Sequence, residues 1–383
     1  MTQDRKPVVS VGRSALKIQY DRSTGKAVVL NPGRRFISSS GPKISIGKPR
    51  FSLRFDRSTG KTSFQYSNNG IGEKRLKLLV TSGDFSRYLS PNFDYLLKEL
   101  DKITDLIVWN KSADIADILK EIGTQPDFVF INEYEETNSP TISGLLSLGI
   151  PHAVNMHDLH YNIDARKASL RRENIRYIFS YYRDRFYECY PEFSRGLYWL
   201  PHHVNTDIFR DYGLTKDIDY LMMGAVHETV YPLRYKILKH MQNMPNFVNH
   251  EHPGYRNIDE DEIGTVFAGE RYAREINRAK IFLTDNSIYS YPLAKYFEVL
   301  ACNTLLLAPS TNELTDLGFI PGVHFVDINE DNFAEKAAYY LGHEAERARI
   351  ARQGFEMVHS RHSTKQRAAE FLKMIKEILF NYR

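Results

Sequence analysis

The sequence predicts an α/β protein with doubly wound parallel sheets, preceded by a small β-hairpin module. From Arg75 onward, short apolar runs suited to strands alternate with amphipathic stretches suited to helices. Several of the runs, such as Leu-Leu-Leu at 305–307, carry no polar residue, which is typical of a central parallel strand buried on both faces. An internal repeat within residues 1–73 predicts the hairpins.

The composition is that of an ordinary globular protein. Hydrophobic residues make up 42% and charged residues 26% of the 383-residue chain, a length that allows two domains and an appendage. The formal net charge of +4 suits an anionic small-molecule ligand but is too small to indicate nucleic-acid binding. Two cysteines give neither a disulfide framework nor a metal set. No signal peptide or spanning segment is visible, so the sequence predicts a cytoplasmic protein.

The repeat lies in the first 73 residues. Asp-Arg-Ser-Thr-Gly occurs at 21–25 and again at 56–60, flanked each time by alternating apolar and polar residues. Alternation on both sides of a glycine-containing turn is typical of a β-hairpin. Gly60-Lys61-Thr62 resembles the end of a phosphate loop, but such a loop needs glycine where this chain has Phe55. We therefore predict two hairpins, which pair with each other, with the rest of the chain or with another subunit.

Residues 75–200 alternate predicted strands and helices in the order of a doubly wound sheet. Strands are predicted at 76–82, 105–110, 127–132, 151–156 and in RYIFSYY and GLYWLP, with helices at 91–103, at 112–123 and immediately before 151. Ligands of such sheets bind at the carboxyl ends of the strands. The predicted binding edge therefore holds Gly83, Asn110, the segment 132–134 and the segment 157–160.

A second alternating region follows a predicted hinge at 201–205. We expect a strand at 219–223, a helix carrying Arg234, a polar loop at 245–268, a strand at 281–284, and three closing helices at 331–341, 344–358 and 364–382. Between these elements, the stretch 291–327 is predicted to hold a helix that starts at Tyr291-Pro292, a buried strand, a short helix and a second strand.

Glu298 is a carboxylate in the apolar helix predicted after Pro292. An ionised carboxylate accepts two hydrogen bonds at once, so it could hold the hydroxyl pair of a ribose. Alternatively, Glu298 pairs with Lys295 three residues earlier, a common and weakly stabilising helix contact.

Gly224 ends the strand predicted at 219–223. Glycine at this place lets backbone N–H groups approach a phosphate, and Arg234 on the following helix could add a positive charge. An arginine on an exposed helix is as readily a solvated surface group, so both interpretations stay open.

His157, Asp158 and His160 directly follow a predicted buried strand, where a catalytic or acceptor-binding group would be presented. A structural loop is the alternative. A metal site is a third reading, but three ligands within four loop residues match no well-known spacing. The pair His250 and His252 is also read as part of a loop, because no cysteine lies near it.

The second half of the chain resembles a known family. The segments that carry the resemblance are KYFEVLACNTLLLAP, ELTDLGFIPGVHFVDI, AAYYLGHEAERARIARQG and HSTKQRAAEFL, in that order. They resemble the C-terminal half of the CgeB-like, or spore-maturation, glycosyltransferases, which belong to the two-domain GT-B sugar transferases. This chain departs from the pattern at Asn303, where relatives carry glycine, and at Ser290, where many GT-B enzymes carry a further glutamate.

The resemblance implies a GT-B fold, in which two Rossmann-like domains face a cleft. Residues 74–203, completed by the helix 364–383, would form the acceptor domain, and residues 204–363 the donor domain. Glu298 would hold the ribose of a nucleotide sugar, and Arg234 with Lys295 would neutralise the leaving diphosphate. The implied donor-binding residues are Glu298, Lys295, Arg234, Gly224, Tyr231, Tyr291 and Asn303.

On the acceptor side the resemblance points to His157, since GT-B enzymes often place a histidine at this strand end. Glu133 is a rival catalytic base, and Asp158 and His160 would lie beside the acceptor. An inverting enzyme needs such a base, whereas a retaining enzyme does not strictly need one. With two cations present, no divalent metal is obligatory.

The donor would be a UDP-, GDP- or TDP-sugar, and the acceptor a glycan, a lipid-linked molecule or a protein, in cell-surface or spore-surface synthesis. Peripheral membrane contact and self-association through residues 1–73 stay open. Two other classes also stay open: a nucleotide-sugar epimerase with His157 and Glu133 as acid and base, and a non-catalytic scaffold with a vestigial donor site.

Overall fold

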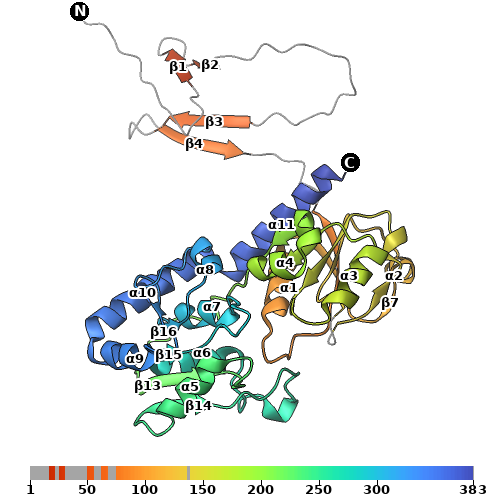
Figure 1. Cartoon of the computed structure of the whole chain (residues 1–383). Helices are drawn as coiled ribbons and strands as arrows, with labels where there is room; N and C mark the ends of the chain where they lie inside the picture. The colour runs from red at the N-terminus through yellow and green to blue at the C-terminus, as the bar shows by residue number, and fades with distance from the viewer. Residues whose placement is uncertain are drawn as a thin grey trace, which may run out of the picture. The chain divides into compact units, whose positions relative to one another are not determined.

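The computed structural model describes residues 75–135 and 139–382, together with the backbone of four strands within residues 1–73. The chain divides into two units, Met1–Glu73 and Lys74–Arg383 (Figure 1). Among the described helices, none combines the length and the apolar character that a membrane span requires.

The first unit contains two antiparallel strand pairs. One joins β1 (Lys17–Asp21) to β2 (Lys26–Leu30), and the other joins β3 (Arg50–Phe55) to β4 (Thr62–Ser67). They lie where the sequence repeat predicts hairpins. The predicted turns at 22–25 and 56–61 fall outside the described residues.

The described part of the second unit contains two large parallel sheets and a small one that pairs β7 (Ala113–Asp114) with β9 (Ile142–Ser143). The first large sheet has six strands in the order β12-β11-β10-β8-β5-β6. The strands are β5 (Lys77–Thr81), β6 (Asp105–Trp109), β8 (Phe128–Ile131), β10 (His152–Met156), β11 (Ile178–Ser180) and β12 (Leu197–Trp199). All five neighbouring pairs are parallel, as the alternating order predicts.

Helices cover both faces of this sheet because alternate strand residues point to opposite sides. Leu78 and Phe128 contribute to a core with α1 (Asn92–Ile103) and α11 (Thr364–Asn381). Leu79 and Val129 contribute to a core on the other face. That core also contains side chains of α2 (Ile115–Ile122), α3 (Ile163–Arg172) and α4 (Arg183–Cys189).

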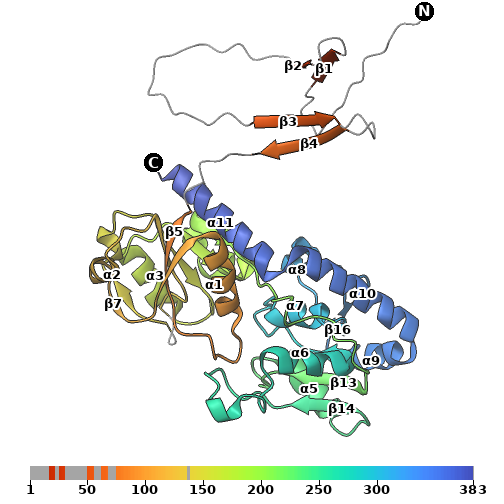
Figure 2. The ribbon, with the colours of Figure 1, turned by 180° about the vertical axis from the view of Figure 1, so that it is seen from behind.

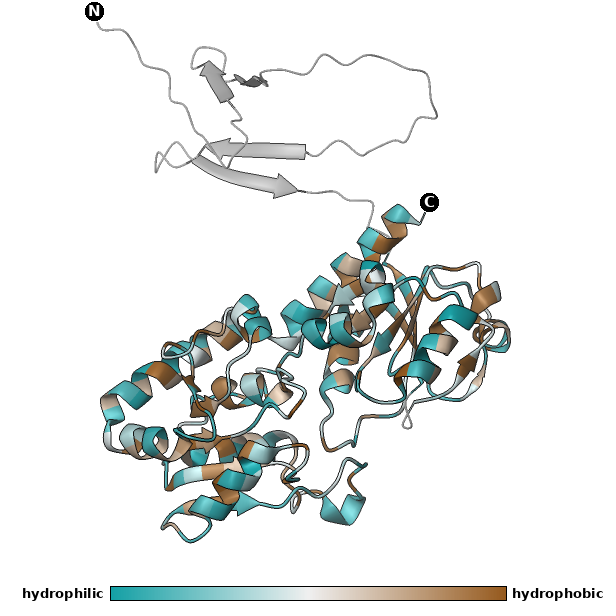
Figure 3. Ribbon diagram, in the orientation of Figure 1, coloured by the Kyte–Doolittle hydropathy of each residue, from teal (hydrophilic) through white to brown (hydrophobic). Residues whose placement is uncertain are grey.

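The second sheet has five strands in the order β14-β13-β15-β16-β17, again all parallel. The strands are β13 (Ile218–Met223), β14 (Phe247–His250), β15 (Ala279–Leu283), β16 (Leu305–Ala308) and β17 (Val326–Asp327). The ribbon coloured by hydropathy shows apolar residues concentrated in the strands and on the helix faces that cover them (Figure 3).

Helices also cover the second sheet on both sides. One core contains residues of α6 (Gly269–Arg278), α7 (Ala294–Ala301) and α8 (Asn312–Asp316). The opposite core contains residues of α5 (Pro232–Met241) and α9 (Phe333–Gly342). The long helix α10 (Glu344–Arg361) contributes to both cores.

Each sheet has a point where the order of the strands reverses. Strand β5 pairs with β6 on one side and β8 on the other, and β13 pairs in the same way with β14 and β15. The loops that leave two such neighbouring strands diverge to opposite faces and leave a crevice at the carboxyl ends. The topology therefore offers one crevice on each sheet.

The chain passes between the two sheets twice, and the two crossings are hydrogen-bonded together. Val204 N–H donates to the His362 carbonyl at 3.0 Å, and Thr364 N–H donates to the Val204 carbonyl at 2.9 Å. After the second crossing, α11 returns to the first sheet, as both ribbon views show (Figure 2). There the Phe371 ring packs edge-on against Phe130, with ring centroids 4.7 Å apart.

Three local predictions are wrong. Helix α7 begins at Ala294 rather than at Tyr291-Pro292, because Leu293 is extended and a turn bond from its N–H to Tyr291 precedes the helix. The segment before 151 forms the short strand β9 (Ile142–Ser143) and a 3₁₀ turn at Leu145–Ser147 instead of an α-helix. The predicted loop 245–268 contains the edge strand β14, which the polar sequence Phe-Val-Asn-His conceals.

The packing of α11 predicts a stability difference between two of its phenylalanines. Phe371→Ala removes a fully buried ring and should lower the free energy of unfolding by about 3–5 kcal/mol. Phe380→Ala, at a position that is 80% exposed, should change it by less than about 0.5 kcal/mol. Urea unfolding of both variants measures the difference, and equal losses would contradict the described packing of α11.

Candidate functional site

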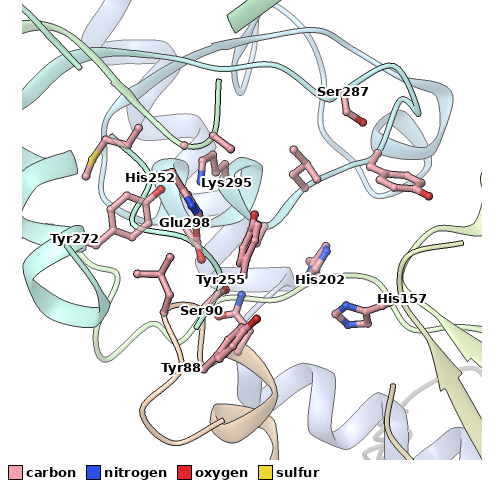
Figure 4. A pocket seen from close by; sticks show the side chains of 18 of the residues that line it. Tyr88, Ser90, His157, His202, His252, Tyr255, Tyr272, Ser287, Lys295 and Glu298 are labelled. Atoms are coloured by element: carbon pink, nitrogen blue, oxygen red, sulfur yellow. The ribbon is translucent and has the colours of Figure 1, made fainter. Parts of the chain in front are cut away.

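A cavity of about 500 Å³ lies between the carboxyl ends of the two sheets. Its lining includes Glu133 and His157, which follow strands of the first sheet, and Gly224, Lys295 and Glu298 from the elements of the second sheet. Figure 4 shows His157 apart from Lys295 and Glu298 across the cavity. This volume is in the range of small-molecule sites in proteins. The two crevices that the sheet topology creates therefore face one shared cleft.

Gly224 forms a turn directly after β13, with a φ of 139° that residues with a side chain rarely adopt. A Cβ atom at this position would lie 3.0 Å from Lys295 Cε and 3.1 Å from Arg234 Nη1. The glycine thus leaves the floor of the cleft open and lets two cationic side chains come close to the backbone.

Arg234 lies in the first turn of α5 and is only 2% exposed. Its guanidinium donates to Thr284 Oγ1 at 3.1 Å and to the carbonyls of Ala225 and Asp285 at 3.0 and 3.2 Å. The guanidinium also lies 4.0 Å from the centre of the Tyr231 ring. These contacts fix the side chain with neutral groups and leave its charge without a bound carboxylate in the described structure, so the solvated-surface alternative does not apply.

Lys295 is the second cation, in the first turn of α7. Burial, together with the nearby charge of Arg234, lowers its pKa to about 8, while Glu298 acts in the opposite direction. No ion pair within the described residues includes Lys295 or Arg234. Two adjacent cations without a paired carboxylate form a site for an anion with more than one charge.

Glu298 lies one helical turn after Lys295 and is 6% exposed. Burial raises the pKa of its carboxyl group, whereas Lys295 and a hydrogen bond with the Asn92 side chain lower it. Asn92 is the first residue of α1, so the partner of this carboxylate comes from a helix that packs on the first sheet. Lys295 acts on Glu298 through its charge rather than as the direct i, i+3 partner that the sequence also allowed.

His157 follows β10 on the opposite wall, and its ring packs edge-on against Tyr181 with centroids 4.2 Å apart. Burial lowers the pKa of His157 to about 4, with a smaller opposing effect of Asp158. The imidazole is therefore neutral near pH 7 and able to accept a proton. Asp158 continues the same loop, and its carbonyl accepts a bond from Arg166 Nη1 at 2.7 Å.

Glu133 follows β8, at the point where the first sheet changes direction. It has a φ of 49°, and a positive value is uncommon for a residue with a long side chain. Ser139 Oγ donates to its carboxylate at 3.3 Å. Strained backbone of this kind gathers at ligand sites, which makes Glu133 a candidate for contact with a ligand.

His160 and Tyr291 line the cleft, but their polar atoms bind each other. His160 Nδ1 lies 3.2 Å from the Tyr291 hydroxyl, and the His160 ring stacks on Tyr289 at 3.9 Å. Tyr291 in turn stacks on Tyr182 at 3.8 Å. These contacts join the loop after β10 to the loop before α7 and so connect the two walls of the cleft.

Asn303 is the one predicted donor-binding residue that the structure does not bring into the cavity. Its φ of 53° is the left-handed conformation expected where relatives carry glycine. Asn303 stands at the far end of α7, and its side-chain amide donates to Asp211 Oδ2 at 2.8 Å. The residue forms a helix-ending corner and does not line the cleft.

Several cleft residues were missed by the sequence reading. His202 lies in the first crossing segment, stacks on Tyr181 at 4.6 Å and lies 3.0 Å from the Tyr182 hydroxyl through Nε2. Tyr255 follows β14, and Tyr88 follows β5. Local sequence gives no signal for these positions, because loops that are far apart in the chain bring them together. His252 was not missed in this way: it belongs to the polar loop 245–268, which the sequence places over the donor site, and it lines the cleft.

His250 forms a bond of 2.8 Å from Nε2 to Glu275 Oε1. Among the described residues, no group of three or more histidine, cysteine, aspartate or glutamate side chains is arranged to hold a metal ion.

Residues 234–373 match the sequence model of the family described as Glycosyl transferase-like. This segment contains Arg234, Lys295 and Glu298. None of the curated proteins matches the chain.

Solved structures match over most of the chain. Sucrose-phosphate synthase from Thermosynechococcus elongatus superposes with a TM-score of 0.59 at 12% identity, over 80% of this chain and 99% of that one. HepE from Anabaena, solved with UDP and glucose, gives 0.54 at 9% identity, over 79% and 100%. A glycosyltransferase from Rickettsia africae gives 0.54 at 14% identity, over 80% and 99%. The fold is GT-B. The doubly wound sheets and the shared cleft of this chain are those of that GT-B fold, as predicted.

The turn at Gly224 predicts a specific effect of adding one carbon atom. Gly224→Ala places a Cβ against Lys295 and Arg234, so it should lower the free energy of unfolding by about 1–3 kcal/mol. The displaced cations should also bind inorganic pyrophosphate about tenfold more weakly, as calorimetry can measure. Gly149→Ala is the matched control, since a Cβ at Gly149 has no neighbour within 4 Å. Unchanged pyrophosphate binding in Gly224→Ala would count against the anion site.

Proposed function

We propose that the protein is a glycosyltransferase that takes a sugar from a nucleotide-sugar donor and transfers it to a hydroxyl group. The observation that carries the proposal is the grouping of two cations, the buried Arg234 and the partly buried Lys295, around the turn at Gly224. Neither forms an ion pair within the described residues. Glu298 lies one helical turn from Lys295. A nucleoside diphosphate has the matching groups, a dianionic diphosphate beside a ribose with two neighbouring hydroxyls.

In the proposed complex the diphosphate lies against Arg234 and Lys295, which stabilise the charge that develops as it leaves. Ala225 after Gly224 and Ala294 at the start of α7 also line the cavity, and their backbone N–H groups are proposed to donate to the diphosphate. The ribose hydroxyls donate to the Glu298 carboxylate, replacing its contact with Asn92. Tyr231 stacks on the Arg234 guanidinium and helps to hold it in place. The base of the nucleotide is left open between uracil, guanine and thymine.

The transfer step breaks one bond and forms another at the anomeric carbon of the donor sugar. The acceptor oxygen bonds to that carbon, and the bond from the carbon to the diphosphate oxygen breaks, with its electron pair staying on the diphosphate. In an inverting reaction His157 takes the acceptor proton, since its imidazole is neutral, and Glu133 is the alternative base. In a retaining reaction the departing diphosphate takes that proton instead.

The comparisons support a glycosyltransferase that uses a nucleotide sugar, but they do not identify the acceptor or the transferred sugar. The Glycosyl transferase-like match begins at Arg234 and includes the cations and Glu298 of the proposed donor site. HepE, which shares the fold, was crystallised with UDP and with UDP-glucose. Membership of the CgeB-like group, a role in cell-surface or spore-surface glycans, and transfer of a hexose remain parts of the proposal.

A nucleotide-sugar epimerase is the second candidate, because His157 and Glu133 both face the cleft from the wall opposite Lys295. Such an enzyme would use the same donor site and would need no acceptor. Incubating the protein with the bound nucleotide sugar alone and analysing the products separates the two: a new epimer favours the epimerase, and an unchanged sugar favours the transferase.

The donor site predicts selective nucleotide binding that depends on Glu298. In a calorimetric and thermal-shift panel of UDP, GDP, CDP and TDP, one nucleotide at a hundred times its dissociation constant should stabilise the wild type by about 2.7 kcal/mol. Glu298→Ala should weaken its binding by about tenfold to a hundredfold, because two charge-assisted hydrogen bonds are lost. Glu335→Ala, at an exposed position of α9, is the control. Equal binding by Glu298→Ala would remove Glu298 from the site, and no binding in the panel would contradict the proposal.

Lys295 predicts a pH dependence for the same nucleotide. Its pKa in the free protein is about 8, so the ammonium form is present below pH 8 and is lost as the pH rises. A bound diphosphate favours the charged form, so affinity should be flat between pH 7 and 8 and then fall by up to about tenfold per pH unit. Lys295→Met should bind more weakly and lose this dependence. A wild-type affinity that stays constant up to pH 9.5 would contradict the role of Lys295.

A further inference from the structure

We propose that residues 254–264 form a lid over the donor site, hinged at Gly254 and Gly264 and held closed by contacts with the loop after β5. The lid opens to admit the nucleotide sugar and to release the nucleoside diphosphate. The inference rests on the proposed transferase function and adds to it the element that controls access to the donor site. Four features of the described residues carry it: an exposed segment, a rigid interior, glycine at both ends, and weak contacts across the cleft.

The lid belongs to a long connection that no core holds in place. Residues 251–268 join β14 to α6, and connections longer than roughly 12–15 residues are usually functional loops or linkers. Every residue from 251 to 265 is partly or fully exposed, and none of them belongs to a hydrophobic core of the described structure. Both ribbon views show the connection extending away from β14 (Figure 1 and Figure 2). The segment can therefore move without disrupting a core.

The interior of the lid is held together by its own hydrogen bonds. The Arg256 guanidinium donates from Nη1 and Nη2 to the two oxygens of the Glu262 carboxylate, each at 2.5 Å. Asp259 N–H donates to the same carboxylate at 3.2 Å, and Glu262 N–H donates to the Asp259 carbonyl at 3.1 Å. Because these bonds join the beginning of the segment to its end, we expect residues 256–262 to move as one body.

Glycine stands close to each end of this rigid segment. Gly254 has a φ of 86° and Gly264 a φ of 93°, values that residues with a side chain rarely adopt. A Cβ atom at either position would have no neighbour within 4 Å, so no packed contact restricts the backbone there. Glycines on both sides of a rigid loop segment are a common form of lid hinge.

The lid is joined to the loop after β5 by two hydrogen bonds and an ion pair, which we call the clasp. Leu89 N–H donates to the Arg256 carbonyl at 3.0 Å. Ile258 N–H donates to the Arg87 carbonyl at 2.8 Å. Arg87 also forms an ion pair with Glu260 at 2.9 Å, and both of these side chains are more than half exposed. Contacts of this kind each add little net stability, so the clasp can open without a large cost in free energy.

The closed lid reaches the residues assigned to the donor. His252 and Tyr255, on either side of the hinge at Gly254, line the same cavity as Lys295 and Glu298. Figure 4 shows His252 beside Lys295 and the Tyr255 ring beside Glu298. Burial lowers the pKa of His252 to about 4, and the charge of Lys295 lowers it further. In the proposed complex the nucleotide lies between Glu298 and Tyr255, so the clasp has to open before the nucleotide can leave.

The proposed motion is local and leaves the two sheets in place. Away from the lid, Tyr182 stacks on Tyr291 with ring centroids 3.8 Å apart. Glu313 of α8 accepts hydrogen bonds from the N–H groups of Arg183 and Asp184. Neither of these contacts between the two halves of the cleft includes a lid residue. The lid can therefore open while the rest of the cleft keeps its shape.

The first test is hydrogen exchange at the Leu89 and Ile258 amides of the full chain, which both donate across the clasp. The measurement is made without ligand and with UDP, GDP, CDP and TDP in turn. A nucleotide that binds beneath the lid favours the closed state, so at a hundred times its dissociation constant it should slow exchange at both amides by about tenfold or more.

The second test changes the hinges. Gly254→Ala and Gly264→Ala should each speed exchange at the clasp amides and dissociation of the bound nucleotide by about threefold to tenfold, because alanine disfavours the positive φ of the closed lid. Gly213→Ala and Gly322→Ala are the matched controls, since both glycines also have a positive φ and open space around the Cβ position. The controls should leave both rates within about twofold of wild type.

The third test reverses the charges of the clasp. Glu260→Arg places a second positive charge beside Arg87, so it should speed exchange at the Ile258 amide and nucleotide dissociation by about threefold. Combining Glu260→Arg with Arg87→Glu restores an ion pair of opposite polarity. The double variant should therefore return both rates to within about twofold of wild type.

The outcomes separate the lid from the proposed function. A nucleotide that binds without slowing the clasp amides, hinge variants that behave like their glycine controls, or a charge reversal that the second substitution does not correct would each overturn the lid and leave the donor site intact. Failure of every nucleotide in the panel to bind would overturn the proposed function and, with it, the role of the lid. Because no lid residue belongs to a core of the described structure, all variants should melt close to wild type, which thermal melts check.

Discussion

The cleft depends on the enclosure of two positive charges that form no ion pair with a carboxylate in the described part of the chain. Arg234 is held by a hydroxyl and two carbonyls, and Lys295 has a depressed pKa because it is buried beside Arg234. Burying charge in this way costs free energy that the fold alone does not recover. A bound polyanion would offset this free-energy cost. Gly224 leaves space for such a ligand, since any side chain at that position would contact both cations.

The same constraint organises the two sheets around the cleft. Asn92 of α1 forms a hydrogen bond with Glu298 of α7. Glu313 of α8 accepts hydrogen bonds from the N–H groups of Arg183 and Asp184 at the start of α4. The stacked rings of Tyr182 and Tyr291 form a third contact. The walls are therefore held in register close to the reaction centre, and a ligand that displaces Asn92 would act directly on one of these contacts.

The sequence predicted the fold because strand and helix patterns are local. Uncharged runs such as 305–307 and the glycine after β13 are visible in the chain itself. So are Lys295 and Glu298, three residues apart on one predicted helix, and Arg234 on the helix predicted after Gly224. The start of α7, the strand β14 and the place of Asn303 depend on tertiary contacts with Tyr291, Tyr220 and Asp211, which no local pattern reveals. Tyr255 and His202 could not be predicted as cleft residues for the same reason, since the cleft that they line forms only when loops from both sheets come together.

The crystal structure of the full chain soaked in turn with UDP and with GDP tests the central claim most directly. The account predicts that one nucleotide places its diphosphate between Arg234 and Lys295 beside Gly224, with its ribose hydroxyls on Glu298 and Asn92 moved aside. A nucleotide bound at any other surface, or an empty cleft under conditions where calorimetry records binding, would contradict the account.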